Sequence, residues 1–347
     1  MAAKLKWGVV GSGGIAQRRT IPEGIVPARN ADLRLVYDVA PEINAEVSRK
    51  FGARAAGSIE ELLASDVDAV YIATPAHLHY QQAIQCARAK KHVLCEKPLG
   101  LTVEEAADMV TTFRDENICL GVGFMMRFAS QHQEALDLVR AGKLGKLVFG
   151  RAQLSCWYPL VEGAWRQIPE QGGGGSLMDM GGHCIDLLEM FFGKVKQVSC
   201  FTNTTVHAYK SEDCATALLV FENGALGTVD AFFCIPDNSS KNALELYGSE
   251  GSIIAQGTVG QEATGTMRAY LDQTDQGYNA QQQRAAAAGT PIAPRPVNTY
   301  LREIEEFSQA VLDGSKPANN GELGLQSQKV LAACYASARS GRSVEIR

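Results

Sequence analysis

The chain has 347 residues, of which 46% are hydrophobic and 20% charged, and its formal net charge is −5. This length predicts two domains, because single hydrophobic cores rarely grow beyond about 250–300 residues. The negative charge disfavours nucleic acid or an anionic membrane as the main partner. The apolar stretches are too short to span a bilayer, and a strand follows the N-terminus too closely for a signal peptide. We therefore expect a cytoplasmic protein.

Strands and helices alternate in the first third of the chain. Apolar runs predict strands at 7–10, 33–37, 69–73, 92–95 and 119–123. Helical patterns lie between them, at 40–51, 59–64, 80–89 and 102–116. Apolar strands that alternate with helices indicate a doubly wound parallel sheet, buried on both faces. The interpretation is an α/β Rossmann domain over residues 1–124.

The pattern changes after Met125. A helix at 131–141, a β-prone run at 146–158 and a helix at 176–192 precede strands with alternating polarity at 195–206, 214–221, 225–235, 241–247 and 252–255. This predicts an α+β domain over residues 125–347, built on a large, mostly antiparallel open sheet. An uncovered apolar face of that sheet would bind a second subunit, giving a homodimer or homotetramer.

The rest of the second domain is predicted from composition and helical spacing. Residues 257–297 are rich in Gln, Gly, Ala and Pro, and we interpret them as an extended, partly mobile excursion. Helices follow at 298–313 and 323–340, and the last is expected to pack back on the first domain. The nine cysteines lack paired spacing, so we expect reduced thiols with a packing role.

A glycine-rich segment follows the first strand and opens a helix. It reads Gly11-Ser12-Gly13-Gly14-Ile15-Ala16 and matches G-x-G-x-x-A. In that context Gly11 permits a tight turn, Gly13 lets the backbone approach a pyrophosphate, and Ala16 allows close packing of helix on strand. Free N–H groups at the helix N-terminus would bind the phosphates. The segment predicts a dinucleotide site.

Asp38 ends the second strand, where a carboxylate binds the adenosine ribose hydroxyls. The same carboxylate would repel a 2′-phosphate, and no Arg or Lys stands in Val39–Glu42 to reverse this. NAD is therefore favoured over NADP. Thr74-Pro75 ends the third strand at the carboxyl edge of the sheet, where a bound dinucleotide should lie.

Two further motifs carry a resemblance to a known family. They are Glu96-Lys97-Pro98, after the fourth strand, and the segment from Gly174 to Asp186, which contains Asp179 and His183. With the glycine fingerprint, they resemble the Gfo/Idh/MocA family, named for glucose–fructose oxidoreductase and inositol dehydrogenase. The resemblance implies a nicotinamide-dependent oxidoreductase in which Lys97, Asp179 and His183 are the catalytic set. It also places His77 and Glu96 on the cofactor side, although Ala76 replaces a frequent Asn of the family.

The residues themselves support that chemistry. Lys97 emerges at the carboxyl edge of the sheet, where it can donate to a substrate hydroxyl and stabilise a developing alkoxide. Asp179 and His183 are four apart, so a helix would place them on one face. His183 is our candidate for the general acid/base, since histidine titrates near neutral pH, and Asp179 for its orienter or a substrate ligand. The substrate would lie between the sheet edge and the glycines at 172–175.

Further candidates for the substrate pocket are weaker, and each could equally have a surface or packing role. Arg127 begins the second domain, and Trp165-Arg166 precedes the glycine loop, where Trp165 could stack on a sugar face. Tyr158 and Tyr300 are additional candidates. Asp179, His183 and Asp186 mimic a metal-ligand spacing, but the chemistry implied by the family needs no metal, and we expect none.

The sequence thus predicts NAD-dependent oxidation of a secondary hydroxyl on a sugar, inositol or related polyol, or the reverse ketone reduction. Two other functions stay open. One is an NAD-retaining, glycoside-cleaving enzyme of the same fold that oxidises C3 transiently. The other is a non-catalytic NAD(H)-sensing protein, against which the complete Lys97, Asp179 and His183 set argues.

Overall fold

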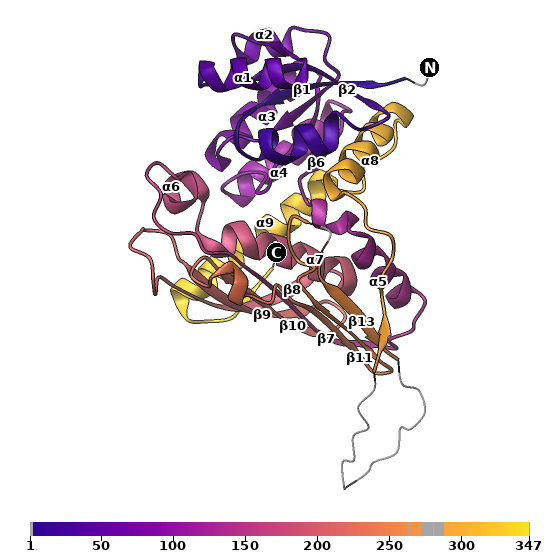
Figure 1. The fold of residues 1–347 in the computed structure, drawn as a ribbon. Helices are drawn as coiled ribbons and strands as arrows, with labels where there is room; N and C mark the ends of the chain where they lie inside the picture. The colour runs from indigo at the N-terminus through magenta and orange to yellow at the C-terminus, as the bar shows by residue number, and fades with distance from the viewer. Residues whose placement is uncertain (1–2, 263, 272–279, 281–287, 347) are drawn as a thin grey trace.

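The structure, a computed structural model, describes residues 3–262, 264–271, 280 and 288–346. The first part of the chain forms a unit around a parallel sheet, and the second part forms a broad sheet with helices between the two (Figure 1). Within the described ranges, no helix combines the length and the apolar character that a membrane crossing requires.

Sheet A has six parallel strands among the described residues, in the order β3-β2-β1-β4-β5-β6. Their bounds are β1 Leu5–Val10, β2 Ala31–Tyr37, β3 Arg54–Ala55, β4 Ala69–Ile72, β5 His92–Cys95 and β6 Leu120–Val122. This is the strand order of a doubly wound dinucleotide fold, whose switch point lies between β1 and β4. The predicted α/β class is confirmed. The two exposed residues of β3 were not predicted, because so short a strand leaves no periodic pattern.

Helices cover both faces of sheet A. They are η1 Ala16–Ile25, α1 Pro41–Phe51, α2 Ile59–Leu63, η2 Ala76–Leu78, α3 His79–Arg88 and α4 Val103–Asp115. Helix η1, which follows the glycine fingerprint, is a π-helix that contains Pro22. A proline has no N–H to donate, so the wide turn of a π-helix fits a site where an α-helical bond is missing.

Sheet B has nine strands among the described residues, in the order β14-β13-β12-β11-β7-β10-β9-β8-β15. Their bounds are β7 Leu147–Ser155, β8 Val195–Asn203, β9 Cys214–Phe221, β10 Leu226–Phe232, β11 Leu244–Gly248, β12 Ser252–Gln256, β13 Thr266–Tyr270, β14 Thr290–Pro291 and β15 Val344–Glu345. Strand β10 pairs with β7 in parallel, and the other pairings between described strands are antiparallel. The predicted mostly antiparallel sheet is confirmed.

The interpretation of residues 257–297 as an excursion is partly wrong. Strands β13 and β14 lie inside this range and extend the edge of sheet B. Both strands are short and have polar neighbours, so the composition of the segment predicted a loop and not strands. Residues 272–279 and 281–287 of this range lie outside the described residues, so the interpretation stays a prediction there.

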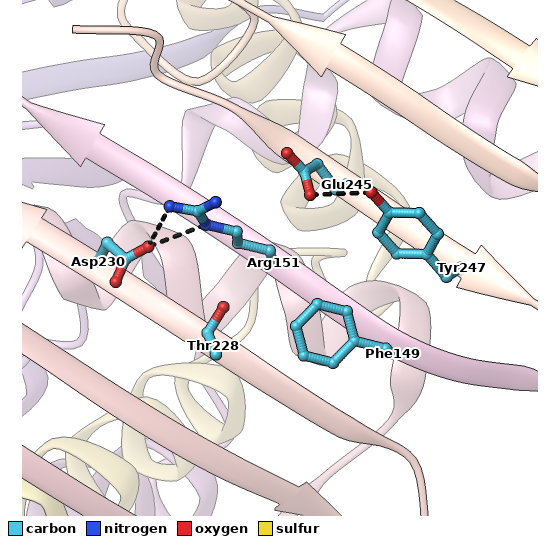
Figure 2. A pocket seen from close by; sticks show the side chains of 6 residues that line it. All are labelled: Phe149, Arg151, Thr228, Asp230, Glu245 and Tyr247. Atoms are coloured by element: carbon cyan, nitrogen blue, oxygen red, sulfur yellow. Dashed lines mark hydrogen bonds and ion pairs between the residues drawn. The ribbon is translucent and has the colours of Figure 1, made fainter.

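One face of sheet B is covered and the other is open. Packed helices lie on the covered face, among them α5 Ser130–Arg140, α7 Gly182–Phe192 and α9 Gly321–Ser340 (Figure 1). The open face carries Phe201, Leu218 and Leu226, of which Phe201 is 73% exposed. Figure 2 shows a shallow hollow on this face, in which Arg151 pairs with Asp230 beside the aromatic rings.

C-terminal segments return to sheet A. The Trp7 indole N–H donates to the Ser308 hydroxyl of α8 (Thr299–Asp313) at 3.1 Å, and the Trp7 and Phe307 rings lie 5.4 Å apart. The Val122 N–H donates to the Asn319 carbonyl at 2.9 Å, just before α9. The C-terminal helices therefore bridge the two sheets, and a domain division at residues 124/125 stays a prediction. All nine cysteines lie in the described residues, and no disulfide joins them.

Candidate functional site

A cavity of about 590 Å³ lies where the carboxyl edge of sheet A meets the second unit. Its lining includes parts of all three sequence motifs, together with several neighbouring aromatic residues. The predicted residues among the lining are Gly14, Ile15, Thr74, Glu96, Lys97, Tyr158, Trp165, Arg166, Asp179, His183 and Tyr300. The structure thus brings together residues that are far apart in the sequence.

The glycine fingerprint forms the floor at one end of the cavity. Gly11 has φ +79°, and a Cβ there would crowd Thr74 of the next strand end at 2.8 Å. Gly14 has φ +54° and borders the cavity, with open space where a side chain would stand. Ser12, Gly13 and Ala16 lie behind this surface, and Ala16 packs fully buried in the core. A positive-φ glycine with open space above it suits a backbone that a pyrophosphate approaches closely.

Asp38 is held against the fingerprint loop. Its Oδ2 accepts a hydrogen bond from the Gly13 N–H at 2.9 Å, and its Oδ1 accepts one from the Ala40 N–H at 3.1 Å. The carboxylate is half-buried and lies outside the lining of the cavity. It therefore borders the loop on the side where the ribose of a dinucleotide would extend beyond the cavity.

The loops after β4 and β5 are joined by one imidazole. His79 lies within hydrogen-bond distance of two carbonyl oxygens, that of Pro98 from Nδ1 (2.7 Å) and that of Thr74 from Nε2 (2.9 Å). This ring borders the cavity, whereas Pro75 and His77 do not. The Lys97–Pro98 peptide bond is cis. His79 therefore fixes the two strand ends that carry Thr74 and Lys97.

A buried carboxylate joins the two sides of the cavity. Asp179 Oδ1 lies 2.6 Å from Lys97 Nζ and 3.1 Å from Arg166 Nε, and Lys97 Nζ also donates to the Asp179 carbonyl at 2.8 Å. Burial would raise the pKa of the Asp179 carboxyl, but the Arg166 and Lys97 cations hold it well below its ordinary value. Asp179 is therefore an anion that orients two cations.

His183 is close to this group but is not bonded to it. Asp179 lies in the π-helix η5 (Leu177–Gly181) and His183 in the α-helix α7 that continues it, and both residues border the cavity. Among the described residues, no hydrogen bond reaches the His183 ring, and its Nδ1 is buried without a partner. Burial, with the charges of Lys97 and Arg166, lowers the pKa of His183 to about 3 despite the opposing charge of Asp179. This shift takes the pKa of the ring below the near-neutral value expected from the sequence.

Glu96 forms part of the wall below Lys97. Tyr71 donates its hydroxyl hydrogen to Glu96 Oε1, and Thr20 lies 2.9 Å from the Tyr71 oxygen. Burial raises the pKa of Glu96, although the bond from Tyr71 and the charge of Lys97 oppose this shift. The carboxyl is therefore harder to ionise than that of Asp179.

The weaker substrate candidates separate into two groups. Trp165, Arg166 and Tyr158 border the cavity, and the Arg166 guanidinium stacks over the Trp165 ring at 4.1 Å. Arg127 does not border it, because its Nε donates to both carboxylate oxygens of Asp186, at 2.8 and 2.9 Å. The prediction that Arg127 contacts substrate is not supported by this placement.

The metal-like spacing does not form a ligand set. Asp186 is paired with Arg127, whereas Asp179 is paired with Lys97. Across the described ranges, no three or more His, Cys, Asp or Glu side chains are arranged to hold a metal ion.

Sequence reasoning missed several residues of the site. Further lining residues come from connecting segments and strand ends, and they are Arg18, Met125, Met126, Leu154, Ser155, Cys156, Met180, Phe233, Asn242, Gly260 and Gln261. Met180 stands inside the Gly174–Asp186 segment and Arg18 in the helix after the glycine fingerprint, but the others belong to no motif, and only the folded chain brings their side chains to the cavity. The four glycines at 172–175 stay outside the lining, contrary to expectation.

Two family models match the chain. The model of an oxidoreductase family with an NAD-binding Rossmann fold covers residues 5–124, and that of the GFO/IDH/MocA C-terminal domain covers residues 132–254. The chain belongs to the Gfo/Idh/MocA oxidoreductase family. This confirms the resemblance carried by the three sequence motifs. The chain is an oxidoreductase with an NAD-binding Rossmann domain.

Relatives of this family cover the whole chain. The 1,5-anhydro-D-fructose reductase of Ensifer adhaerens is 28% identical over 98% of this chain and 98% of its own length. D-xylose 1-dehydrogenase (NADP(+)) 2 of Haloferax volcanii is 28% identical over 99% of this chain and 100% of its own. The crystal structure of aldose-aldose oxidoreductase from Caulobacter crescentus, complexed with glycerol, has a TM-score of 0.87 at 26% identity and covers 99% of both chains.

The protonation of His183 can be tested directly. We expect its ring to stay neutral between about pH 5 and 8 in the ligand-free protein, because burial and two cations disfavour the imidazolium. Lys97→Met should raise the pKa of His183 by removing one cation, and Asp179→Asn should lower it further. The measurement is NMR of ring-labelled histidine, with His183→Asn to assign the signal. A His183 signal that titrates in that range in the unaltered protein would contradict the assignment.

Proposed function

We propose that this family member oxidises a secondary hydroxyl of a sugar, inositol or related polyol with NAD, or reduces the corresponding ketone. The observation that supports it is one cavity that holds Lys97, Asp179 and a neutral, unbonded His183 beside Gly14 of the dinucleotide loop. The relatives named for sugar reduction, sugar oxidation and aldose oxidoreduction make a sugar-like substrate the natural choice.

The residues fit a nicotinamide dinucleotide. The open space at Gly14, the carboxylate of Asp38 on the loop and the position of Thr74 at the strand end suit its pyrophosphate, ribose and nicotinamide ends. A nicotinamide held by these residues would supply the hydride acceptor for the carbon that carries the reacting hydroxyl. The chain must then bind that hydroxyl, orient it and take its proton.

Lys97 and His183 divide this task. The Lys97 ammonium, held by Asp179, can donate to the substrate oxygen and stabilise the negative charge that develops there. The neutral His183 ring has no hydrogen-bond partner among the residues that the structure describes, so one of its nitrogens is available to accept the hydroxyl proton. The low pKa of the ligand-free ring keeps it neutral, and so able to accept a proton, but it also makes the ring a weak base and its protonated form a strong acid for the reverse reduction.

Aromatic and cationic groups opposite the dinucleotide loop suit a polyhydroxylated ligand. The Trp165 face, stacked on Arg166, offers an apolar surface next to hydrogen-bond donors. A sugar matches this surface, because its C–H faces can pack on the Trp165 ring and its hydroxyls can accept hydrogen bonds from Arg166. Tyr158 and Asn242 add polar groups to the same part of the cavity.

The catalytic roles predict the outcome of two substitutions. Lys97→Ala and His183→Ala should each lower turnover by about 10²–10⁴-fold, because each removes a proton-handling or charge-stabilising group. Binding of NADH, followed by fluorescence, should be largely retained. Turnover is measured as NAD reduction with a panel of inositols, aldoses and glycosides.

Lys91→Ala is the matched control for the lysine. Lys91 is also half-buried and donates to the carbonyls of Ser65 and Val67, but it lies outside the cavity. It should keep wild-type turnover. Near-normal turnover in both Lys97→Ala and His183→Ala would rule out the proposed roles.

The proposed preference for NAD rests on the Asp38 carboxylate at the fingerprint loop. Asp38→Asn keeps an oxygen that can accept from the Gly13 N–H but removes the charge that repels a 2′-phosphate. We expect the ratio of kcat/KM for NADP to that for NAD to rise about tenfold or more, equivalent to about 1.4 kcal/mol. Asp32→Asn, which alters a surface ion pair on the same strand, is the control. An unchanged ratio would contradict the role of Asp38.

We further propose that a second copy of the chain covers the open face of sheet B. Apolar side chains on neighbouring strands form this face, since Leu226 stands opposite Phe149, and Phe149 opposite Tyr247. The central Arg151–Asp230 pair and the Glu245 carboxylate supply polar groups for a self-complementary contact (Figure 2).

A charge on this face should disrupt the assembly. The double substitution Phe201→Glu and Leu218→Glu places carboxylates where exposed apolar side chains now stand, so the mass by light scattering should fall to that of a monomer. Val39→Glu changes a residue that is 85% exposed on the first unit, and it should leave the mass unchanged. A monomeric wild-type protein would refute the proposal.

A further inference from the structure

The glycine loop before η5 is packed against two residues that the sequence did not single out. A Cβ on Gly174 would overlap the Tyr335 hydroxyl of α9, and one on Gly175 would overlap the carbonyl oxygen of Glu212. The missing side chains of Gly174 and Gly175 therefore leave room for Tyr335 and Glu212, and not for a ligand. Glu212 comes from the segment between β8 and β9.

Glu212 satisfies three consecutive backbone donors of this loop. Its carboxylate accepts from the Gly175 N–H at 2.9 Å and from the Leu177 N–H at 3.0 Å. Its carbonyl accepts from the Ser176 N–H at 3.0 Å. The first N–H groups of a helix lack partners within the helix, so one residue here supplies what several capping groups would otherwise supply.

The carboxylate is itself held in place. Tyr335, which is partly buried on α9, donates its hydroxyl hydrogen to Glu212 Oε1 at 2.8 Å. Burial raises the pKa of Glu212, whereas the bond from Tyr335 and those from the backbone lower it. A negative group at the N-terminus of a helix also interacts favourably with the aligned peptide dipoles. These contacts favour a single position of the carboxylate.

The turn that Glu212 fixes carries Asp179. The Asp179 N–H donates to the Gly175 carbonyl at 3.0 Å, so the backbone of Asp179 is one hydrogen bond away from the residue that Glu212 holds. Asp179 must then reach Lys97 and Arg166 on the other side of the cavity, at 2.6 and 3.1 Å. A shift of the turn would move this carboxylate away from both cations.

We propose that Glu212 is a positioning residue, which fixes the first turn of η5 and thereby aims the Asp179 carboxylate at Lys97 and Arg166. The proposal rests on the proposed function, in which Lys97 acts on the substrate oxygen. Glu212 does not border the cavity and touches no reacting atom. Its effect on turnover passes through Asp179.

A double-substitution cycle tests this coupling. Glu212→Gln keeps the size of the side chain but leaves a single acceptor oxygen for the Gly175 N–H, the Leu177 N–H and the Tyr335 hydroxyl. We expect kcat to fall about 10- to 100-fold, as misplacement of a catalytic group does, with NADH binding unchanged. In an Asp179→Asn background, which has already lost the charge that Glu212 aims, the same substitution should cost less than about threefold.

Glu189→Gln is the matched control. Glu189 is another partly buried carboxylate that accepts from a backbone N–H, that of Val195 at 2.8 Å, and from a side chain, that of Gln326 at 2.9 Å. It lies outside the lining of the cavity, so its loss should lower the thermal midpoint without lowering kcat.

Each outcome of the cycle decides the proposal. A small loss in the Asp179→Asn background supports it. Equal losses with and without Asp179→Asn would show that Glu212 acts only on general stability, and they would overturn its role while the proposed function stands. Full turnover in Asp179→Asn alone would overturn both, because the ion group would then have no part in the reaction.

Discussion

The buried carboxylate of Asp179 between Lys97 and Arg166 is the interaction on which the arrangement of the site depends. A single buried anion would be costly, and two cations left without it would be costlier still. The group also joins three separate segments, since Lys97 follows β5, Arg166 lies in the short helix η4 (Trp165–Gln167) after β7, and Asp179 lies in η5. The ion group can form only when both units of the chain are folded and in contact.

The same group sets the electrostatics of the cavity. The two cations Lys97 and Arg166 share the one ionised carboxylate of Asp179, so the charge balance within this ion group is positive. That balance disfavours a proton on His183, and it favours negative charge on an oxygen that binds between Lys97 and the ring. A ligand whose oxygen gains negative charge during reaction is therefore stabilised more strongly than the neutral ligand, which is the condition for catalysis.

The sequence predicted those parts of the fold that depend on local pattern. Strands of sheet A such as 69–73 are buried on both faces, so they appear as apolar runs between helices. Strands β3 and β15 have two residues each and leave no such pattern. Site residues were predicted where they stand in a contiguous motif, as Lys97 and His183 do. Glu212 and Gln261 belong to connecting segments whose place is set by tertiary pairing, so no local signal marks them.

Arg127 shows why position along the chain is a weak guide to contact with a ligand. It follows Met125 and Met126, which border the cavity, yet its guanidinium turns to the buried Asp186 carboxylate. Burial raises the pKa of Asp186 to about 6 even beside that cation, so the pair is needed to keep the carboxyl ionised. An arginine whose charge is needed inside the protein is not available to a substrate. Arg166 differs because it borders the cavity, even though its Nε lies 3.1 Å from Asp179. The distinction between a structural and a functional cation is therefore made by the partner that each one finds in the folded chain.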